Sequence, residues 1–247
     1  MSELTGKTAL VTGGAKRVGS AIAKGLASEG VNVVVHYSKS KDEATKLCEE
    51  IKRLGVKSWL ASADFSEPDS CRQLITKACE LSGRLDILVN NASVFLASTI
   101  DSVSLEAINA EMLTNAWTPL LLSRYFAEKA EYGKIVNLLD TRIVGYDFNH
   151  VAYYLSKRML EVLTKMLALK LAPKITVNGI APGLILPPKG KDSSYLELQK
   201  DKVPLKKYGS VSNIVDTVLF FVKNDFVTGQ TIHVDGGKHL TQTIEGL

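Results

Sequence analysis

The feature that most constrains the fold is a regular alternation of short apolar runs with longer amphipathic stretches. The apolar runs are rich in Val and Ile and cover residues 8–12, 31–36, 58–61, 87–89, 135–139, 175–180 and 231–234. Between them, helical periodicity covers residues 18–29, 41–54, 67–81, 104–129, 151–171 and 211–223. Short apolar strands separated by helices are typical of a parallel sheet that is covered on both faces. We therefore predict a doubly wound α/β fold with a seven-stranded parallel sheet and helices on both faces.

The whole chain, residues 1–247, fits one Rossmann-like domain. Such α/β folds are often single units at this length, and an apolar content of 45% can fill a large core. No repeat, low-complexity tract or linker divides the sequence. The longest irregular stretch covers residues 182–208 and contains Pro182, Pro187, Pro188 and Pro204. Since long loops in compact domains usually have a function, we predict a substrate loop at about residues 183–208.

Composition argues against several kinds of partner. The net charge is +4, with Lys and Arg scattered among Asp and Glu, which gives no support to nucleic-acid binding. Cys48, Cys71 and Cys79 lack the paired spacing of a disulfide framework or a metal site, so we expect reduced thiols and no metal. No basic and apolar leader precedes Lys7, and no apolar run approaches the ~20 residues that cross a bilayer. We expect a cytoplasmic protein, without a membrane anchor, that acts on a small molecule.

The first predicted strand runs into a glycine-rich turn, TGGAKRVG at residues 12–19, and then into a helix. Backbone amides above a helix N-terminus suit a pyrophosphate, so this turn, with Gly13, Lys16 and Val18, predicts a dinucleotide site. The usual GxGxxG spacing is not matched, and Arg17 stands where a small residue is expected. Its guanidinium can bind phosphate oxygens or reach the substrate; alternatively, it is a surface residue on a variant turn.

The end of the second predicted strand, HYSKS at residues 36–40, predicts NADP(H) rather than NAD(H). A site for NAD carries a carboxylate here to bind the ribose 2′-hydroxyl, but the first acid is Asp42, inside the next helix. The donors that stand there instead fit a 2′-phosphate, and they are Ser38, Lys39 and Ser40, with Lys16 and Arg17 across the turn. Asp64, after the third predicted strand, can accept from the adenine amino group or cap the next helix.

Polar residues collect where the central strands end. Asn90 and Asn91 follow the fourth predicted strand, at the edge where ligands bind in such sheets, although both also suit a turn. Phe95 follows on a loop, where an exposed aromatic side chain predicts a flat partner. Asn115 lies within a predicted helix, where asparagine is disfavoured unless it bonds to the backbone or to water. The fifth strand brings Asp140 to the same edge.

Tyr153 and Lys157 are the central catalytic candidates. They lie four residues apart at the start of a predicted helix, so their side chains share one face. An ammonium beside a phenol favours the phenolate, so we expect Lys157 to lower the pKa of Tyr153 from its usual value of about 10. Tyr and Lys at this spacing also occur on solvated helix faces, so the prediction depends on the other motifs of the chain.

Four motifs together give the chain a resemblance to the short-chain dehydrogenase/reductase family. They are TGxxxxxG after the first strand, NNA after the fourth, YxxxK after the fifth and PG, at residues 182–183, after the sixth. Three departures from the commonest pattern of that family agree with one another: Arg17 in the turn, Ser93 and Phe95 after NNA, and Asp140 where a catalytic serine usually stands. With these departures the chain resembles the pteridine reductases and the bacterial dihydromonapterin or dihydrofolate reductases of the family.

The resemblance implies roles for these residues. The implied catalytic residues are Asp140, Tyr153, Lys157 and Asn115, of which Asn115 would hold a water molecule or a backbone kink in the proton path. The substrate would be held by Arg17, Ser93, Phe95, Asp140 and Tyr153, with Phe95 stacking it against the nicotinamide ring. Together with the strand-end patterns, the resemblance gives a cofactor-binding set of Gly13, Lys16, Arg17, Val18, His36, Tyr37, Ser38, Lys39, Ser40, Asp64, Asn91, Ala92, Ser93, Tyr153, Lys157, Pro182 and Gly183. It also suggests that the helices at 104–129 and 151–171 pair between the subunits of a homotetramer; ordinary packing on the sheet is the alternative.

The carboxylate at position 140 bears on the substrate class. Ketone reduction builds negative charge on oxygen, which a carboxylate repels, whereas reduction of a C=N bond needs a proton at nitrogen, which a carboxyl group helps to deliver. We therefore predict hydride transfer from NADPH to a pterin-type C=N bond, with Tyr153 protonating the nitrogen. Thr141 can supply a hydroxyl if Asp140 points away, which keeps a carbonyl reductase, such as a 3-oxoacyl-thioester reductase, as the alternative. A non-catalytic NADP-binding sensor is a second alternative.

Overall fold

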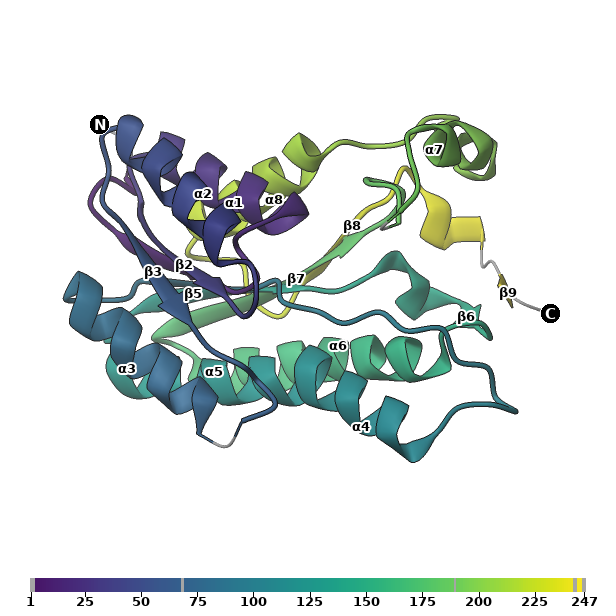
Figure 1. The fold of residues 1–247 in the computed structure, drawn as a ribbon, viewed down its shortest axis with the longest axis horizontal. Helices are drawn as coiled ribbons and strands as arrows, with labels where there is room; N and C mark the ends of the chain where they lie inside the picture. Colours follow the sequence, from purple (N-terminus) through teal and green to yellow (C-terminus); the bar gives the residue numbers. More distant parts are fainter. Residues whose placement is uncertain (1–2, 68, 189, 242–243, 246–247) are drawn as a thin grey trace.

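Seven strands form one sheet in the computed structural model, which describes residues 3–67, 69–188, 190–241 and 244–245 (Figure 1). All neighbouring strands run parallel, in the order β3-β2-β1-β4-β5-β7-β8. The strands are β1 Thr8–Val11, β2 Asn32–Tyr37, β3 Ser58–Ser62, β4 Ile87–Asn90, β5 Gly133–Leu138, β7 Ile175–Pro182 and β8 Thr231–Val234. The strand order reverses between β1 and β4, and ligands bind such sheets in the crevice beyond the carboxyl ends at that point. The predicted sheet is confirmed.

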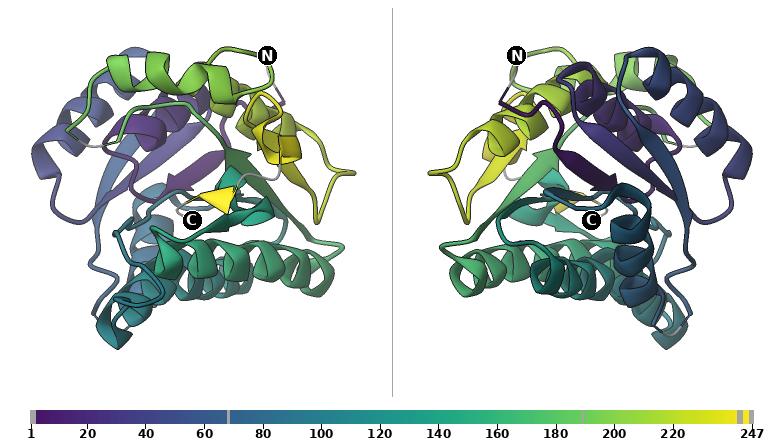
Figure 2. Two further views of the ribbon diagram at one scale, coloured as in Figure 1. Left: turned by 90° about the vertical axis from the view of Figure 1, so that its right-hand side faces the viewer. Right: turned by 90° about the vertical axis from the view of Figure 1, so that its left-hand side faces the viewer.

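Helices cover both faces of the sheet, as predicted (Figures 1 and 2). One face carries α1 Arg17–Ser28, α2 Lys41–Arg53 and α8 Val211–Lys223. The other carries α3 Ser70–Ser82, α5 Thr118–Lys129 and α6 Val151–Leu171, with α4 Leu105–Met112 beside α6. Successive residues of a strand point to opposite faces, so Ala9 and Val11 join the core with α1 while Leu10 joins the core with α5.

Three segments differ from the sequence prediction. The helix predicted at 104–129 is divided into α4, a π-helix η1 Leu113–Trp117, and α5. The stretch at 182–208 is not wholly irregular, since it contains α7 Ser194–Gln199 and a 3-10 helix η3 Lys200–Lys202; Lys189 lies outside the described residues. Unpredicted short elements gather beyond the carboxyl ends of the strands (Figure 1): the 3-10 helices η2 Thr141–Val144 and η4 Lys238–Thr241, and the paired strands β6 Tyr146–Asp147 and β9 Ile244–Glu245.

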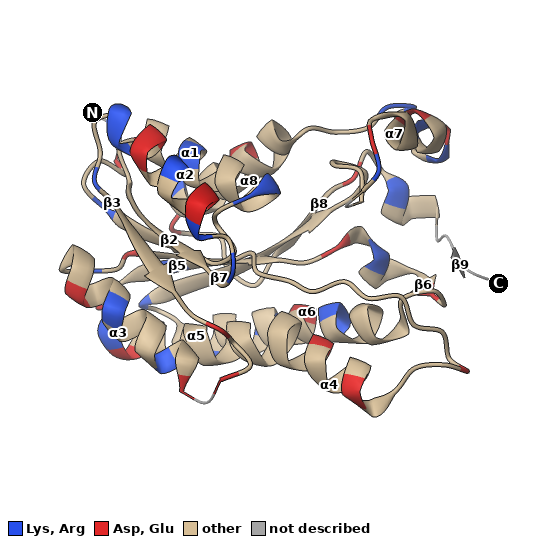
Figure 3. Cartoon of the chain, viewed as in Figure 1, with Lys and Arg blue, Asp and Glu red and all other residues tan. Residues whose placement is uncertain are grey.

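The surface mixes charges of both signs and keeps one apolar helix face. Lys and Arg are interspersed with Asp and Glu over the helices (Figure 3). On α6, Leu160, Leu163 and Leu167 are buried, as ordinary packing on the sheet requires, while exposed apolar side chains follow another face of the helix, at Leu155, Val162, Met166 and Leu169. Among the described residues, no helix is both long and apolar enough to span a membrane.

Candidate active site

Three predicted catalytic side chains lie together beyond the carboxyl end of β5. Asp140 precedes η2 and caps it, while Tyr153 projects from the first turn of α6. Tyr153 Oη donates to Asp140 Oδ2 at 3.0 Å. Lys157, one turn later, donates from Nζ to Leu138 O at 2.7 Å. Tyr153 and Lys157 are buried and Asp140 is half-buried, so the hydroxyl and the ammonium lie inside the protein while the carboxylate keeps some contact with solvent.

The pKa of Tyr153 is shifted in the direction opposite to the sequence prediction. Burial raises this pKa well above its usual value, and the charge of Asp140 and the hydrogen bond to it raise it further. The Lys157 ammonium donates to a backbone carbonyl and lies 5.7 Å from the centroid of the Tyr153 ring. Burial lowers the pKa of Lys157 to about 8, against the opposing charge of Asp140. The predicted lowering of the Tyr153 pKa by Lys157 is therefore wrong for this structure, in which burial and Asp140 favour the neutral phenol.

Asn115 holds the loop that follows β4 from within the π-helix. Its Oδ1 accepts from Val94 N and from Ser93 Oγ, both at 2.9 Å. Its Nδ2 donates to Val94 O and to Ser156 Oγ, both at 3.0 Å. Asn115 is fully buried, so these bonds satisfy an amide that would otherwise be costly inside the protein. Of the two predicted roles, the backbone kink is the one that matches this geometry.

Phe95 forms an aromatic wall beside Tyr153. Its side chain is 45% exposed, its ring meets the Tyr153 ring edge-on at 4.6 Å between centroids, and it stacks on His150 at 4.2 Å. The Arg142 guanidinium lies 5.1 Å from the centre of the Phe95 ring and donates to Asp147 Oδ2 at 2.7 Å. Arg142, Asp147 and His150 were not predicted. The only sequence signal for Arg142 was its place two residues after the aspartate that ends the fifth strand.

The glycine turn is held by residues that follow β1 and β4. Asn91 Nδ2 donates to Thr12 O at 2.9 Å and to Gly13 O at 3.1 Å. Thr12 Oγ1 accepts from the backbone N–H groups of Asn91 and Ala92 at 2.9 and 3.0 Å. A Cβ at Gly19 would lie 2.3 Å from Gly13 O and 2.6 Å from Asn91 Nδ2, so the turn needs glycine there. Asn91 thus holds the glycine turn from the end of β4, and its side chain bonds to Thr12 and Gly13 instead of to its own backbone.

His36 fixes the glycine turn from the end of β2. Its Nδ1 accepts from Gly13 N at 3.0 Å, its carbonyl accepts from Gly14 N at 2.9 Å, and its Nε2 lies 3.2 Å from Ala63 O. The ring stacks on Phe65, and burial lowers the pKa of His36 to about 4, so the imidazole is neutral. The amides of these two glycines therefore face inward, contrary to the sequence prediction. The amides that begin α1, which have no intrahelical partner, remain available to a phosphate.

Two of the basic residues predicted for the 2′-phosphate have other partners. Lys16 Nζ pairs with Glu43 Oε1 at 2.6 Å, with both side chains about half exposed. Arg17 Nη2 donates to Pro187 O at 2.6 Å, which ties the glycine turn to the predicted substrate loop. Arg17 has a φ of 53°, in the left-handed region that favours glycine. The donors left exposed at the end of β2 are Ser38 and Lys39.

Asp64 forms a local turn. Its Oδ1 accepts from Ser66 N at 3.0 Å and from Ser66 Oγ at 2.7 Å, which lowers the pKa of this exposed carboxyl. Asp64 and Tyr37 also line a cavity of about 700 Å³ between the β3 edge and α3, and none of the predicted catalytic residues lines it. The predicted helix cap at Asp64 is therefore wrong, since α3 has Asp69 at its N-cap and Asp64 holds only a local turn; the cavity lies outside the catalytic centre.

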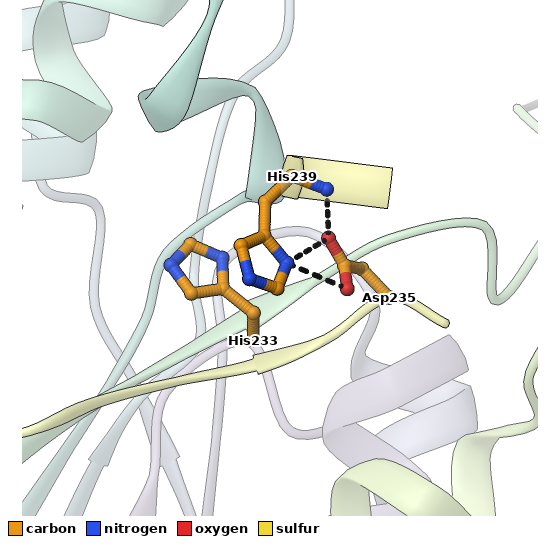
Figure 4. A group of neighbouring side chains, drawn as sticks. All are labelled: His233, Asp235 and His239. Atoms are coloured by element: carbon orange, nitrogen blue, oxygen red, sulfur yellow. Dashed lines mark hydrogen bonds and ion pairs between the residues drawn. The ribbon is translucent and has the colours of Figure 1, made fainter. Parts of the chain in front are cut away.

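A cluster beyond β8 joins the C-terminal segment to the catalytic edge. Asp235 accepts from Thr141 Oγ1 and from His239 N, and a Cβ at Gly183 would lie 2.5 Å from Asp235 Cβ. The His239 ring lies with Nδ1 2.9 Å from Asp235 Oδ2 and stacks on His233 at 4.2 Å and 19° (Figure 4). Stacked imidazoles direct their in-plane lone pairs along nearly parallel planes rather than toward one point. Asp235 and His239 are therefore joined by hydrogen bonds and His233 joins them by stacking, an arrangement that differs from a tetrahedral ligand set.

The chain is similar to reductases of several activities. A family model described as Enoyl-(Acyl carrier protein) reductase matches residues 13–239. The 3-oxoacyl-acyl-carrier-protein reductase FabG of Staphylococcus epidermidis is 34% identical over 250 residues, 95% of this chain and 99% of that protein. Pteridine reductase 1 of Leishmania tarentolae is 33% identical over 283 residues, 96% of this chain and 98% of that protein. The solved structure of FolM Alternative dihydrofolate reductase 1 from Brucella canis complexed with NADP has a TM-score of 0.92 at 34% identity, over 96% of this chain and 95% of that one.

Proposed function

Because the chain belongs to the short-chain dehydrogenase/reductase family, we propose that it is an NADPH-dependent reductase that transfers hydride to the C=N bond of a pterin-type substrate. A dihydropterin, dihydromonapterin or dihydrofolate fits this description. The main evidence is that Asp140, where the family usually has serine, accepts the hydrogen bond of Tyr153 Oη at 3.0 Å. Thr141, whose hydroxyl would serve a carbonyl reductase, is buried and donates to Asp235 instead.

The charge at position 140 favours a nitrogen acceptor. A ketone develops negative charge on its oxygen during reduction, and a carboxylate beside that oxygen opposes it. A C=N nitrogen receives a proton as hydride arrives at carbon, so a carboxylate that orients the donor assists the reaction. The raised pKa of Tyr153 keeps the phenolic proton in place until that moment. The Tyr153–Asp140 pair is therefore suited to protonating nitrogen.

The residues present fit a dinucleotide phosphate. The turn at Gly19 leaves no space for a side chain, the first N–H groups of α1 need no partner within the helix, and Lys39 is exposed after β2. NADPH, when bound, supplies the hydride. Lys157 would hold the nicotinamide ribose, since its ammonium carries further N–H groups beyond the bond to Leu138 O. The FolM structure complexed with NADP supports this choice of cofactor.

The chain's own residues divide the remaining work. Tyr153 gives its phenolic proton to the substrate nitrogen, and Asp140 holds the hydroxyl that gives it. Phe95 offers its exposed ring to the substrate, and contacts with His150 and Arg142 hold that ring in place. Asn115 fixes the loop that carries Phe95, so the wall is rigid relative to α6.

A 3-oxoacyl-thioester reductase is the competing function, because the FabG relative is as similar in sequence as the pteridine reductase. Steady-state rates with NADPH should be compared for dihydrobiopterin, dihydromonapterin, dihydrofolate and a series of 3-oxoacyl thioesters. We expect pterin reduction to exceed thioester reduction, and Asp140→Ala to lower pterin reduction at least about 100-fold. Asp101→Ala, at an exposed turn, is the matched control. Faster wild-type turnover of the thioesters, or undiminished pterin reduction in Asp140→Ala, would contradict the proposal.

We further propose that the protein assembles as a homotetramer through the exposed apolar face of α6, at Leu155, Val162, Met166 and Leu169. Contiguous exposed apolar patches of this kind often mark protein–protein interfaces. Light scattering should give the mass of four chains for the wild type and a smaller mass for Val162→Glu. A wild-type monomer would contradict this assembly.

A further inference from the structure

Glu111 is a buried acid whose role in the site is not explained by the residues above. It lies in the last turn of α4, one turn before Asn115, and its side chain is 0% exposed. Its Oε1 accepts from Leu96 N at 2.6 Å, in the loop that carries Phe95. Its Oε2 is buried and has no hydrogen-bond partner within the part of the chain that the structure describes. Such an oxygen is costly unless it is protonated or bonded to water, so its retention calls for an explanation.

The groups that face Glu111 are those of the catalytic centre. Helix α4 packs against α6, and the carboxyl interacts electrostatically with Lys157 and with Tyr153 on that helix. The charge of Asp140, beyond β5, raises the pKa values of both residues, and the charge of Arg142 lowers the pKa of Tyr153. The loop at residues 91–100, which also packs on Glu111, has no titratable side chain, and the other acid of α4, Glu106, is exposed. Glu111 is thus a member of one buried charge cluster with Lys157.

The pKa values of Glu111 and Lys157 both lie near neutral pH. Burial raises the pKa of Glu111 to about 7, while the bond from Leu96 N and the charge of Lys157 oppose the rise. Burial lowers the pKa of Lys157 to about 8. An acid and a base with such close values exchange a proton at little cost in free energy.

We propose that Glu111 is a positioning and proton-supplying residue that acts through Lys157, restoring the proton that Tyr153 loses in each turnover. As the substrate N–H bond forms, the Tyr153 O–H bond breaks. An N–H proton of Lys157 then passes to the phenolate, and the protonated Glu111 carboxyl returns a proton to the Lys157 amine by way of water at Oε2. Solvent water reprotonates the Glu111 carboxylate, so the net proton comes from solvent. This inference rests on the proposed reductase function for its kinetic test only.

A structural role must be separated from this one, because Glu111 also holds the loop at Leu96. Glu111→Gln makes the separation, since the amide oxygen still accepts from Leu96 N while the group can no longer ionise. Its melting temperature and its affinity for NADPH should therefore stay near the wild-type values. Glu106→Gln, on the exposed side of the same helix, is the matched control.

The kinetic test is the pH dependence of kcat for the best pterin substrate. Only the protonated carboxyl supplies a proton, so wild-type kcat should fall as pH rises through about 7, and the Gln variant should lack this limb. We expect Glu111→Gln to be at least about 10-fold slower than wild type at about pH 6, with the two rates converging at about pH 9. A rate ratio that stays constant over this range, or parallel pH profiles, would overturn the proposal.

A second measurement does not depend on the substrate. In protein labelled with ¹³C at the Glu carboxyl carbons, the resonance absent from Glu111→Gln should titrate near neutral pH. In Lys157→Met the same resonance should titrate at higher pH, because the ammonium that stabilises the carboxylate is gone. A carboxyl that titrates at the usual Glu value, or that ignores Lys157→Met, would overturn the proposal. If no pterin is reduced, the reductase function fails, while this spectrum still decides the coupling of Glu111 to Lys157.

Discussion

The two halves of the sheet use their polar side chains in different ways. Around the glycine turn, Thr12, His36 and Asn91 are neutral and bond chiefly to backbone atoms of the turn and its neighbouring strands. Beyond β5, Asp140 and Tyr153 are titratable and bond to each other. The first arrangement fixes a shape, whereas the second holds a proton ready for transfer. We infer that the cofactor half is sensitive to changes in packing and the catalytic half to changes in ionisation.

Removing the catalytic hydroxyl should have the largest effect and should leave the fold intact. Tyr153→Phe deletes the group that donates to Asp140 Oδ2, so we expect kcat for pterin reduction to fall by about 1,000-fold or more. Asp140 is half-buried and can turn to water, so the free energy of unfolding should change by about 1 kcal/mol or less. Single-turnover kinetics and urea unfolding measure the two effects.

Tyr154→Phe provides the control for this change, since it removes a phenolic hydroxyl from the next residue, which faces a different direction on α6. Tyr154 lies near Tyr146 and has no bond to Asp140. We expect its rate to remain within about 2-fold of wild type. A Tyr153→Phe variant that kept most of its activity, or that lost its cofactor affinity, would show that the two halves do not divide their tasks in this way.

His36 is the exception that sharpens the comparison, because it is a titratable residue that the structure keeps neutral. The pKa of His36 is about 4 in the folded protein and about 6.5 when exposed, so only the unfolded chain binds the proton between these values. The stabilising effect of the neutral ring is complete above about pH 6.5 and is lost as pH falls toward about 4. A shift of this size corresponds to about 3 kcal/mol.

Urea unfolding at several pH values tests this expectation. His36→Asn keeps an acceptor for Gly13 N and cannot take up a proton, so its stability should be lower at pH 7 but should fall less steeply in acid. The variant should also bind NADPH more weakly, because the turn loses its support. Equal slopes for the two proteins between about pH 6.5 and 4 would contradict a buried neutral His36.

The fold was predictable because its signals are local. The helices predicted at 151–171 and 211–223 coincide with α6 and α8, and all seven strands were found within a few residues of their bounds. The division of the helix at 104–129 was not predicted. A π-helix differs from an α-helix by one residue in a turn, and an asparagine within an apolar pattern was its only sign.

The members of the site were also predictable, since a parallel sheet brings the ends of its strands to one edge. Asp140, Tyr153 and Lys157 were predicted as a group, and the structure brings them together. What each side chain bonds to was not predictable, because the partners come from distant parts of the chain. Arg17 donates to Pro187 O, 170 positions away, and Glu111 accepts from Leu96 N in the loop that follows β4.

The hydrogen bond from Thr141 to Asp235 has a consequence for the order of folding. It joins residues that are 94 positions apart, and Asp235 follows the edge strand that is last in the chain to enter the sheet. Loop closure over such a distance is entropically costly and comes late. Thr141, the residue next to Asp140, therefore gains its hydrogen bond to Asp235 only after β8 has joined the sheet. The glycine turn, in contrast, is held by residues at the ends of β1, β2 and β4, and these hydrogen bonds depend on nothing from the C-terminal end of the chain.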